Sequence, residues 1–251
     1  MRHAALAWGL AVVLTLSACD DSDEVAESPP EQPVVVGSVL WPPAVEGDLQ
    51  VQVADNPLAT SYLILLDNSG SMSEVECSGG QSKFDVARSA IADFAASLPP
   101  TDNIALAVFT DTAARIVVPY GSGEGQAKAL SRALGTLTPT EGTPLRGAIG
   151  TAYDDVTRQA QAQLGYGTHR LVIVTDGESQ DGDPAPVARS IVGRSAIELH
   201  VIGFCTGSGH SLNIPGITRY YTADDPAALA EGLVAVRAET TTFDAVATFN
   251  E

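Results

Sequence analysis

The strongest constraint on the fold is a regular alternation of short apolar runs with amphipathic segments between residues 61 and 239. The run 171–174 is apolar at every position, as expected for a central strand that is buried on both faces. This alternation predicts an α/β fold, with a doubly wound, mostly parallel six-stranded sheet and helices on both faces. The expected strands are residues 61–67, 104–109, 115–119, 171–174, 198–204 and 220–221.

The expected helices are marked by apolar residues at spacings of three and four and by recognisable boundaries. Ser82 and Asp85 resemble a capping box at the start of the first helix, and Pro99 stops that helix. The run 115–119 is predicted to be a short edge strand, which Gly121-Ser122-Gly123 separates from the next helix. The next helix is expected to carry Leu130, Leu134 and Leu137. The helix after it should open at Thr143, with Pro144 as its first helical residue. The last two helices should cover 184–195 and 226–239.

The N-terminal segment has the pattern of an export signal. Residues 1–3 supply a positive start, and residues 4–16 form an apolar stretch that is short for a permanent transmembrane helix. Leu16-Ser17-Ala18-Cys19 resembles a bacterial lipobox, in which Cys19 is lipidated and becomes the first residue. An ordinary signal-peptidase site is the alternative, but it fits less well because Leu16 stands where a small residue is usual.

Composition along the chain predicts its organisation. The segment after Cys19 is acidic and then rich in proline, so it cannot bury a core and is expected to act as a tether. The predicted parts are a lipoprotein signal peptide at 1–18, a tether at 19–38, a lead-in segment at 39–57, a folded domain at 58–240 and a tail at 241–251. The lipid anchor predicts a place in the bacterial cell envelope, on a membrane and facing the periplasm or the cell exterior.

The net charge argues against some classes of binding partner. The chain has 251 residues and a net charge of −18, and its 45% of hydrophobic residues is ordinary for a globular domain. Such an acidic surface argues against nucleic acid and against binding anionic lipid by charge, because phosphate groups would be repelled. Membrane contact is therefore expected through the lipid anchor only.

A carboxylate and two hydroxyls follow directly on the apolar run 62–66. Asp67, Ser69 and Ser71 occupy alternate positions, so their oxygens can converge where a buried strand becomes a loop. Oxygen ligands suit a hard divalent cation such as Mg²⁺. Taken singly, the two serines could instead satisfy the backbone of the loop.

Two further loops are predicted to open on the same edge of the sheet, where doubly wound folds bind their ligands. They are Glu141-Gly142-Thr143-Pro144 and Thr175-Asp176-Gly177-Glu178. Thr143 alone could be a helix N-cap, and Asp176 with its glycine could be a turn. Together the three loops resemble the metal-ion-dependent adhesion site of von Willebrand factor type A (VWA) domains, and the resemblance covers about residues 58–240.

This resemblance implies a site and a function. Ser69 and Ser71 would bind Mg²⁺ or Mn²⁺ through their hydroxyls, and Thr143 would join them in the ligand-bound state. Asp67 and Asp176 would act mainly through water. Neutral hydroxyls leave the ion most of its charge, so an Asp or Glu carboxylate of a protein partner could replace a water molecule. The resemblance thus implies a binding module and no enzyme.

Two other functions are open at this stage. A metal-dependent hydrolase would use the cation as a Lewis acid and would need a general base, for which His210, Glu178 and Asp67 are candidates. The sequence has no Gly-x-Ser-x-Gly elbow, which would indicate a nucleophilic serine. The other alternative is a structural envelope protein whose metal site is vestigial.

Cys77 and Cys205 are both expected just beyond the carboxyl ends of strands. An exported compartment is oxidising enough for them to form a disulfide. The alternative is two buried free thiols, while metal ligation is disfavoured because no Cys/His cluster accompanies them.

The loop after Asp176 carries three acidic residues, Glu178, Asp181 and Asp183. A solvated acidic loop is the favoured interpretation and a second cation is the alternative, since the spacing matches no EF-hand. His210 is expected in a surface loop, and the histidines at 169 and 200 are expected to be structural.

Overall fold

The computed structural model describes residues 40–44, 52–140 and 142–238. The predicted signal peptide, the lipidation site Cys19, the tether up to residue 38 and the tail from residue 241 lie outside the described residues. Within the described part of the chain, no helix is both long enough and apolar enough to cross a membrane.

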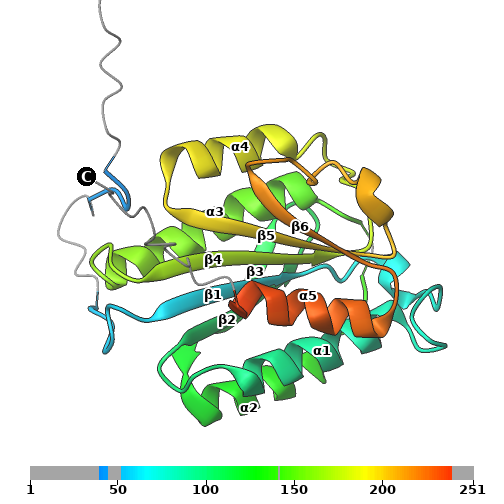
Figure 1. Cartoon of the computed structure of the whole chain (residues 1–251), viewed down its shortest axis with the longest axis horizontal. Coiled ribbons are helices and arrows are strands. Elements are labelled where there is room, and N and C mark those ends of the chain that lie inside the picture. Colours follow the sequence, from blue (N-terminus) through cyan, green and yellow to red (C-terminus); the bar gives the residue numbers. More distant parts are fainter. Residues whose placement is uncertain (1–39, 45–51, 141, 239–251) are drawn as a thin grey trace, which may run out of the picture. The chain divides into compact units, whose positions relative to one another are not determined.

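Six strands form one sheet in the order β3-β2-β1-β4-β5-β6 (Figure 1). The β3 strand runs antiparallel to β2, and the other neighbours are parallel. This topology confirms the predicted fold class. The strands are β1 (Thr60–Leu66), β2 (Asn103–Phe109), β3 (Ala114–Ser122), β4 (Thr168–Thr175), β5 (Ile197–Phe204) and β6 (Thr218–Ala223).

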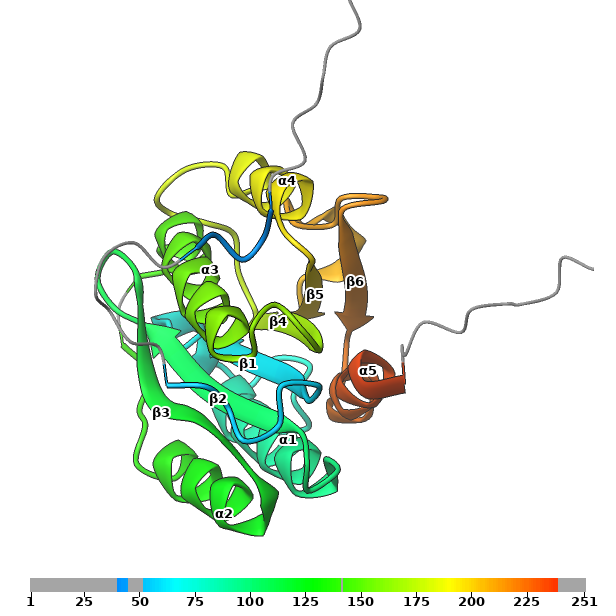
Figure 2. The same cartoon turned by 90° about the vertical axis from the view of Figure 1, so that its left-hand side faces the viewer.

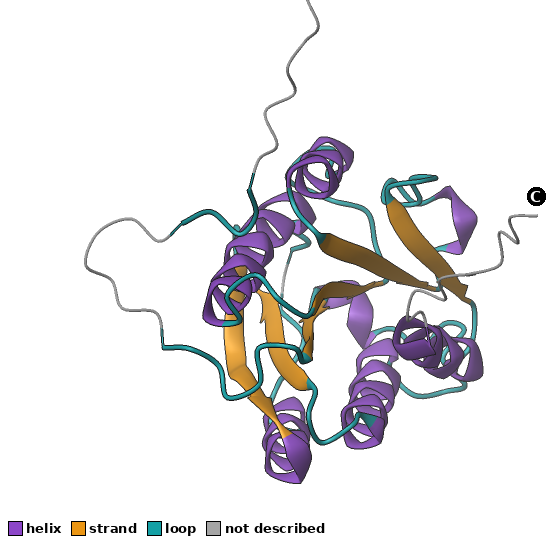
Figure 3. Cartoon of the chain, turned by 60° about the vertical axis from the view of Figure 1, so that its left-hand side comes forward, coloured by secondary structure: helices purple, strands orange, loops and turns teal. Residues whose placement is uncertain are grey.

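Helices cover both faces of the sheet, as Figures 2 and 3 show. One face packs against α1, α2 and α5, and the other packs against α3 and α4. Side chains alternate along a strand, so Ile64 and Leu66 of β1 enter the first core while Leu63 and Leu65 enter the second. The helices are α1 (Lys83–Ser97), α2 (Gly123–Leu134), α3 (Leu145–Ala162), α4 (Ala185–Arg194) and α5 (Pro226–Ala238).

The start of α1 follows the predicted signal in part. The Ser82 side chain accepts a hydrogen bond from the backbone N–H of Asp85 at 3.0 Å. In a complete capping box, the Asp85 carboxylate would accept the backbone N–H of Ser82. It pairs instead with Arg88, at 2.9 Å. Leu98 caps the other end of the helix, directly before Pro99.

The edge strand β3 is longer than predicted. It continues past 115–119 to Ser122, because Gly121 and Ser122 pair with Ile104 and Asn103 at the start of β2. An irregularity in the register beside Leu106 lets the proline-containing strand stay paired, as is usual at a sheet edge. Gly121 and Ser122 therefore belong to β3, and α2 follows at Gly123 without a separating loop.

The carboxyl ends of β1 and β4 meet at the centre of the sheet. These strands are direct neighbours, while the strands that follow them along the chain lie on opposite sides, so this edge is a topological switch point. The 3₁₀ helix Gly70–Ser73, here η1, follows β1 at this end (Figure 1, right). The fold therefore brings the first and third predicted loops together.

Candidate metal centre

Asp67 is the first residue after β1 and is fixed by the neighbouring strand. Its backbone N–H donates to the carbonyl of Val174 at 2.8 Å, which extends the β1–β4 pairing by one residue. One carboxylate oxygen accepts the N–H of Ser69 at 2.8 Å, and the other accepts the hydroxyl of Thr175 at 2.6 Å. Burial raises the pKa of Asp67 to about 6, although these hydrogen bonds oppose the rise. The buried carboxylate thus sets the shape of the first loop.

Ser69, Ser71 and Asp176 form a continuous chain of polar contacts. The hydroxyl oxygens of Ser69 and Ser71 are 3.0 Å apart, and the Ser71 hydroxyl donates to Asp176 Oδ1 at 2.8 Å. The two serines come from the loop that enters η1, whereas Asp176 directly follows β4. The structure therefore brings together four of the five residues predicted to hold a metal, counting Asp67.

The spacing of these oxygens fits a small divalent cation. Neighbouring ligands in an Mg²⁺ octahedron, each about 2.1 Å from the ion, lie about 3.0 Å from one another. The hydroxyl oxygens of Ser69 and Ser71, which are 3.0 Å apart, match this separation. The described residues contain no cluster of three His, Cys, Asp or Glu side chains, so the candidate centre depends on hydroxyls and two carboxylates. Such a donor set suits Mg²⁺ or Mn²⁺.

Thr143 lies in the second loop, which is fastened to both of the others. The backbone N–H and carbonyl of Thr143 bond to Gln180 at 3.2 and 2.9 Å, in the loop after Asp176. Thr140 is held by Asn68 of the first loop, whose side-chain amide donates to the Thr140 hydroxyl at 3.1 Å. Thr143 is buried, but the described contacts of its hydroxyl include none with the serines or with Asp176. The backbone bonds tie Thr143 to the loop that follows Asp176.

Lys83 is a component of the centre that the sequence analysis missed. Its ammonium group lies 3.0 Å from Asp176 Oδ2 and 3.1 Å from Glu74 Oε2. Burial alone would lower the pKa of Lys83, but the hydrogen bonds and charges of the two carboxylates outweigh burial and raise it. Lys83 therefore carries its positive charge beside the candidate metal centre.

Asp181 is exposed, as expected of a solvated acidic loop, but its carboxylate also has a structural role. Its carboxylate accepts the backbone N–H groups of Arg146 and Gly147 at 3.0 and 2.7 Å. It therefore caps the start of α3, which begins at Leu145. Pro144 occupies the N-cap position and is not the first helical residue, and Thr143 does not cap the helix. Burial opposes ionisation, but these hydrogen bonds hold the pKa of Asp181 below its usual value.

His210 is buried, and the expectation of a surface histidine is wrong. Its Nδ1 accepts the N–H of Leu212 at 3.0 Å, so Nε2 carries the proton and donates to the carbonyl of Gly177 at 2.9 Å. Glu178 is also held, because both its oxygens bond to the backbone and hydroxyl of Ser211 at 3.0 and 2.5 Å. Both residues fasten the loop after Asp176. His169 and His200 are fully buried, as expected of structural residues.

Cys77 and Cys205 form a disulfide, with Cα atoms 6.2 Å apart, and the predicted pairing is confirmed. Cys77 lies between η1 and α1, and Cys205 is the first residue after β5. The bond links the continuation of the first loop to the carboxyl end of β5, which β4 separates from β1 in the sheet. It therefore braces the same edge of the sheet that carries the candidate centre.

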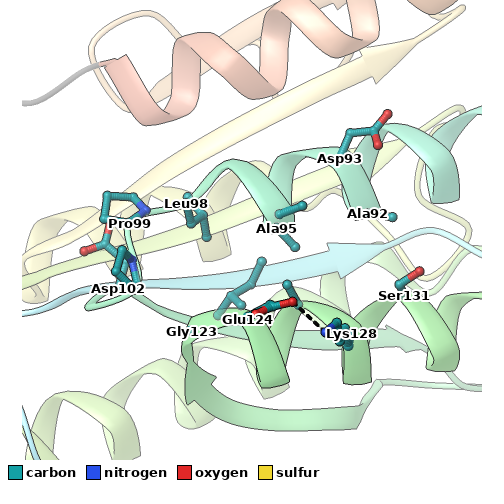
Figure 4. A pocket seen from close by; sticks show the side chains of 14 residues that line it. Ala92, Asp93, Ala95, Leu98, Pro99, Asp102, Gly123, Glu124, Lys128 and Ser131 are labelled. Atoms are coloured by element: carbon teal, nitrogen blue, oxygen red, sulfur yellow. Dashed lines mark ion pairs between the residues drawn. The ribbon is translucent and has the colours of Figure 1, made fainter.

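A hollow of about 510 Å³ between α1 and α2 lies away from this edge (Figure 4). Leu98 and Pro99 at the end of α1 line it, together with Glu124 and Lys128, which form an ion pair. Lys83 stands at the other end of α1, and a helix of 15 residues is about 22 Å long. The candidate centre thus lies at the loops beyond β1 and β4 and does not share this hollow.

Comparison with known proteins identifies the family of this fold. The profile of the family described as von Willebrand factor type A domain matches residues 63–235, which is more than half of the chain. The chain belongs to the VWA domain family. The matched range starts within β1 and ends within α5, so it includes the whole candidate centre.

A relative and two solved structures show how far the likeness extends. The uncharacterized protein YwmD of Bacillus subtilis is 27% identical over 164 residues, which are 60% of this chain and 70% of YwmD. A von Willebrand factor type A structure from Catenulispora acidiphila has a TM-score of 0.57 and 22% identity, and covers 72% of this chain. The pilus adhesin SpaC from Lactobacillus rhamnosus GG has a TM-score of 0.56 and 14% identity, and covers 74%.

The structural matches cover less than half of each matched protein. The aligned region spans 42% of the Catenulispora chain and 31% of SpaC, so most of each of those proteins has no counterpart in the comparison. At such low identity the matches show the VWA fold alone. The roles of individual residues in this chain must be argued from its own geometry.

Proposed function

We propose that this protein is a lipid-anchored VWA domain of the bacterial cell envelope that binds a protein partner through Mg²⁺ or Mn²⁺. The observation that carries the proposal is the convergence of the Ser69 and Ser71 hydroxyls, whose oxygens are 3.0 Å apart, with Asp176 bonded to Ser71 beside them. The lipobox around Cys19 supports the anchor and the compartment. The chain belongs to the VWA family, and its structural matches include a pilus adhesin. Both observations support protein binding.

The donor set accounts for the chemistry of binding. Ser69 and Ser71 would contribute neutral oxygens, and the two carboxylates would hold water molecules or the ion's second shell. A cation bound in this way keeps positive charge that a side-chain carboxylate of the partner can meet. Thr143, whose backbone bonds to Gln180 in the loop of Asp176, would join when a partner approaches.

The hydrolase alternative draws no support from the positions of its candidate bases. Both ring nitrogens of His210 and both oxygens of Glu178 already bond within the protein. Asp67 is fully buried and bonds to Ser69 and Thr175. Each of the three side chains is therefore already engaged in hydrogen bonds within the protein.

A capture experiment tests the proposed function. Wild-type protein immobilised through its lipid anchor is expected to retain a partner from envelope extract, and EDTA is expected to release it. The Asp67→Ala, Ser69→Ala double variant should retain none, because it lacks a carboxylate and a hydroxyl of the centre. Equal capture by the wild type and by a folded double variant, with or without EDTA, would contradict the proposal.

A further inference from the structure

Lys83 stands in an unusual place for a basic residue. It is the first residue of α1, where the positive end of the helix dipole disfavours a cation. Its side chain is only 6% exposed, and lysine is almost never so buried unless it is paired. These costs are offset by Asp176 and Glu74, whose carboxylate oxygens lie 3.0 and 3.1 Å from the ammonium group.

Asp176 divides its two oxygens between Lys83 and the candidate metal centre. Oδ1 accepts the hydroxyl of Ser71 at 2.8 Å, and Oδ2 accepts the ammonium group of Lys83 at 3.0 Å. The side chain of Asp176 is 0% exposed, so bulk water does not screen this pair. A divalent cation at the serine hydroxyls would therefore share one carboxylate with Lys83, and the two positive charges would repel each other.

We propose that Lys83 is the internal counter-ion of the metal centre, which neutralises Asp176 when no divalent cation is bound and weakens cation binding when one arrives. This inference rests on the proposed function, since it concerns the same centre. Glu74 offsets the charge of Lys83 only in part, because its side chain is 56% exposed and screened by water. The buried carboxylate of Asp176 is thus paired with a positive charge in both states of the protein.

Lys83→Met is expected to change stability and affinity in opposite directions. In EDTA the variant should melt about 10 °C below the wild type, because removing one partner leaves a buried carboxylate unpaired. Its Kd for Mn²⁺ should be about tenfold lower than that of the wild type, because the repulsion is gone. Thermal unfolding in EDTA and in saturating MnCl₂, together with calorimetric titration of the purified full-length protein with MnCl₂, measures both effects.

Two variants serve as controls. Lys128→Met makes the same substitution at an exposed lysine of α2, whose pair with Glu124 is 69% and 82% exposed, and should change neither quantity. Glu74→Gln leaves the Lys83–Asp176 pair intact but removes the charge that partly offsets Lys83. It should therefore weaken Mn²⁺ binding, and it tests the proposal even if Lys83→Met does not fold.

The outcomes separate this inference from the proposed function. A Lys83→Met variant that loses equal stability in EDTA and in MnCl₂, without tighter Mn²⁺ binding, would make Lys83 merely structural and overturn the proposal. Unchanged Mn²⁺ affinity in Glu74→Gln would also count against it. If the wild type binds no Mn²⁺, the proposed function fails. Binding by Lys83→Met alone would then support the counter-ion role. Binding by neither protein would overturn the counter-ion role as well.

Discussion

Replacing Cys77 and Cys205 together by serine is expected to lower the free energy of unfolding by about 3–5 kcal/mol. The bond joins residues 128 positions apart, so it removes many conformations from the unfolded chain. Both cysteines have a backbone in the left-handed region, with φ of 50° at Cys77 and 64° at Cys205, where residues other than glycine are uncommon, and the bond must offset this local cost. Urea denaturation of the wild type and the double variant measures the difference.

Reduction of the wild type provides the matched control for this prediction. A reducing agent should lower the stability of the wild type to that of the double serine variant and leave the variant unchanged. Equal stability of the two oxidised proteins would contradict the prediction. So would two thiols that can be alkylated in native protein prepared under oxidising conditions, because the structure pairs them.

Asp67→Asn is expected to stabilise the cation-free protein by about 1–3 kcal/mol at pH 7.5 while removing stabilisation by Mg²⁺. The folded-state pKa of Asp67 is raised to about 6 by burial, so its ionised form is costly in the native state. The amide of asparagine keeps the shape of the side chain and can still accept the N–H of Ser69 and contact Thr175. Chemical denaturation in EDTA and in MgCl₂ gives both quantities.

The pH dependence provides a second check on this substitution. A carboxyl group whose folded pKa lies above its unfolded value binds more protons in the native state. The stability of the cation-free wild type should therefore fall as pH rises from about 4 to about 6, and Asp67→Asn should lack this fall. Asp85→Asn changes an exposed carboxylate of α1 and should keep it. A destabilised Asp67→Asn variant with a wild-type pH profile would contradict the explanation.

The fold and the main residues of the site could be predicted because their signals are local. Apolar runs locate β1 and β4, and the positions at which these runs end locate Asp67 and Asp176. The two serines follow at fixed short distances from Asp67. The disulfide could be predicted as well, because both cysteines follow elements that end on one edge of the sheet.

The missed features depend on contacts between distant parts of the chain. Lys83 looks like an ordinary first residue of an amphipathic helix, and its partner Asp176 is 93 residues away. Asp181 lies 34 and 35 residues from the two N–H groups of α3 that it caps, so no local sequence pattern predicts this contact. His210 is buried because its ring bridges two loops. A partial signal existed only for Lys83, since a helix start disfavours a positive charge.

Calorimetric titration of the cation-free protein with MgCl₂ and MnCl₂ tests the central claim most directly. The account predicts saturable binding of one cation by the wild type and by Ser73→Ala, whose exposed serine lies in η1. It predicts that binding is lost in Ser71→Ala, because that hydroxyl contacts both Ser69 and Asp176. Heat no greater than that of dilution for the wild type, or equal binding by a folded Ser71→Ala variant, would contradict it.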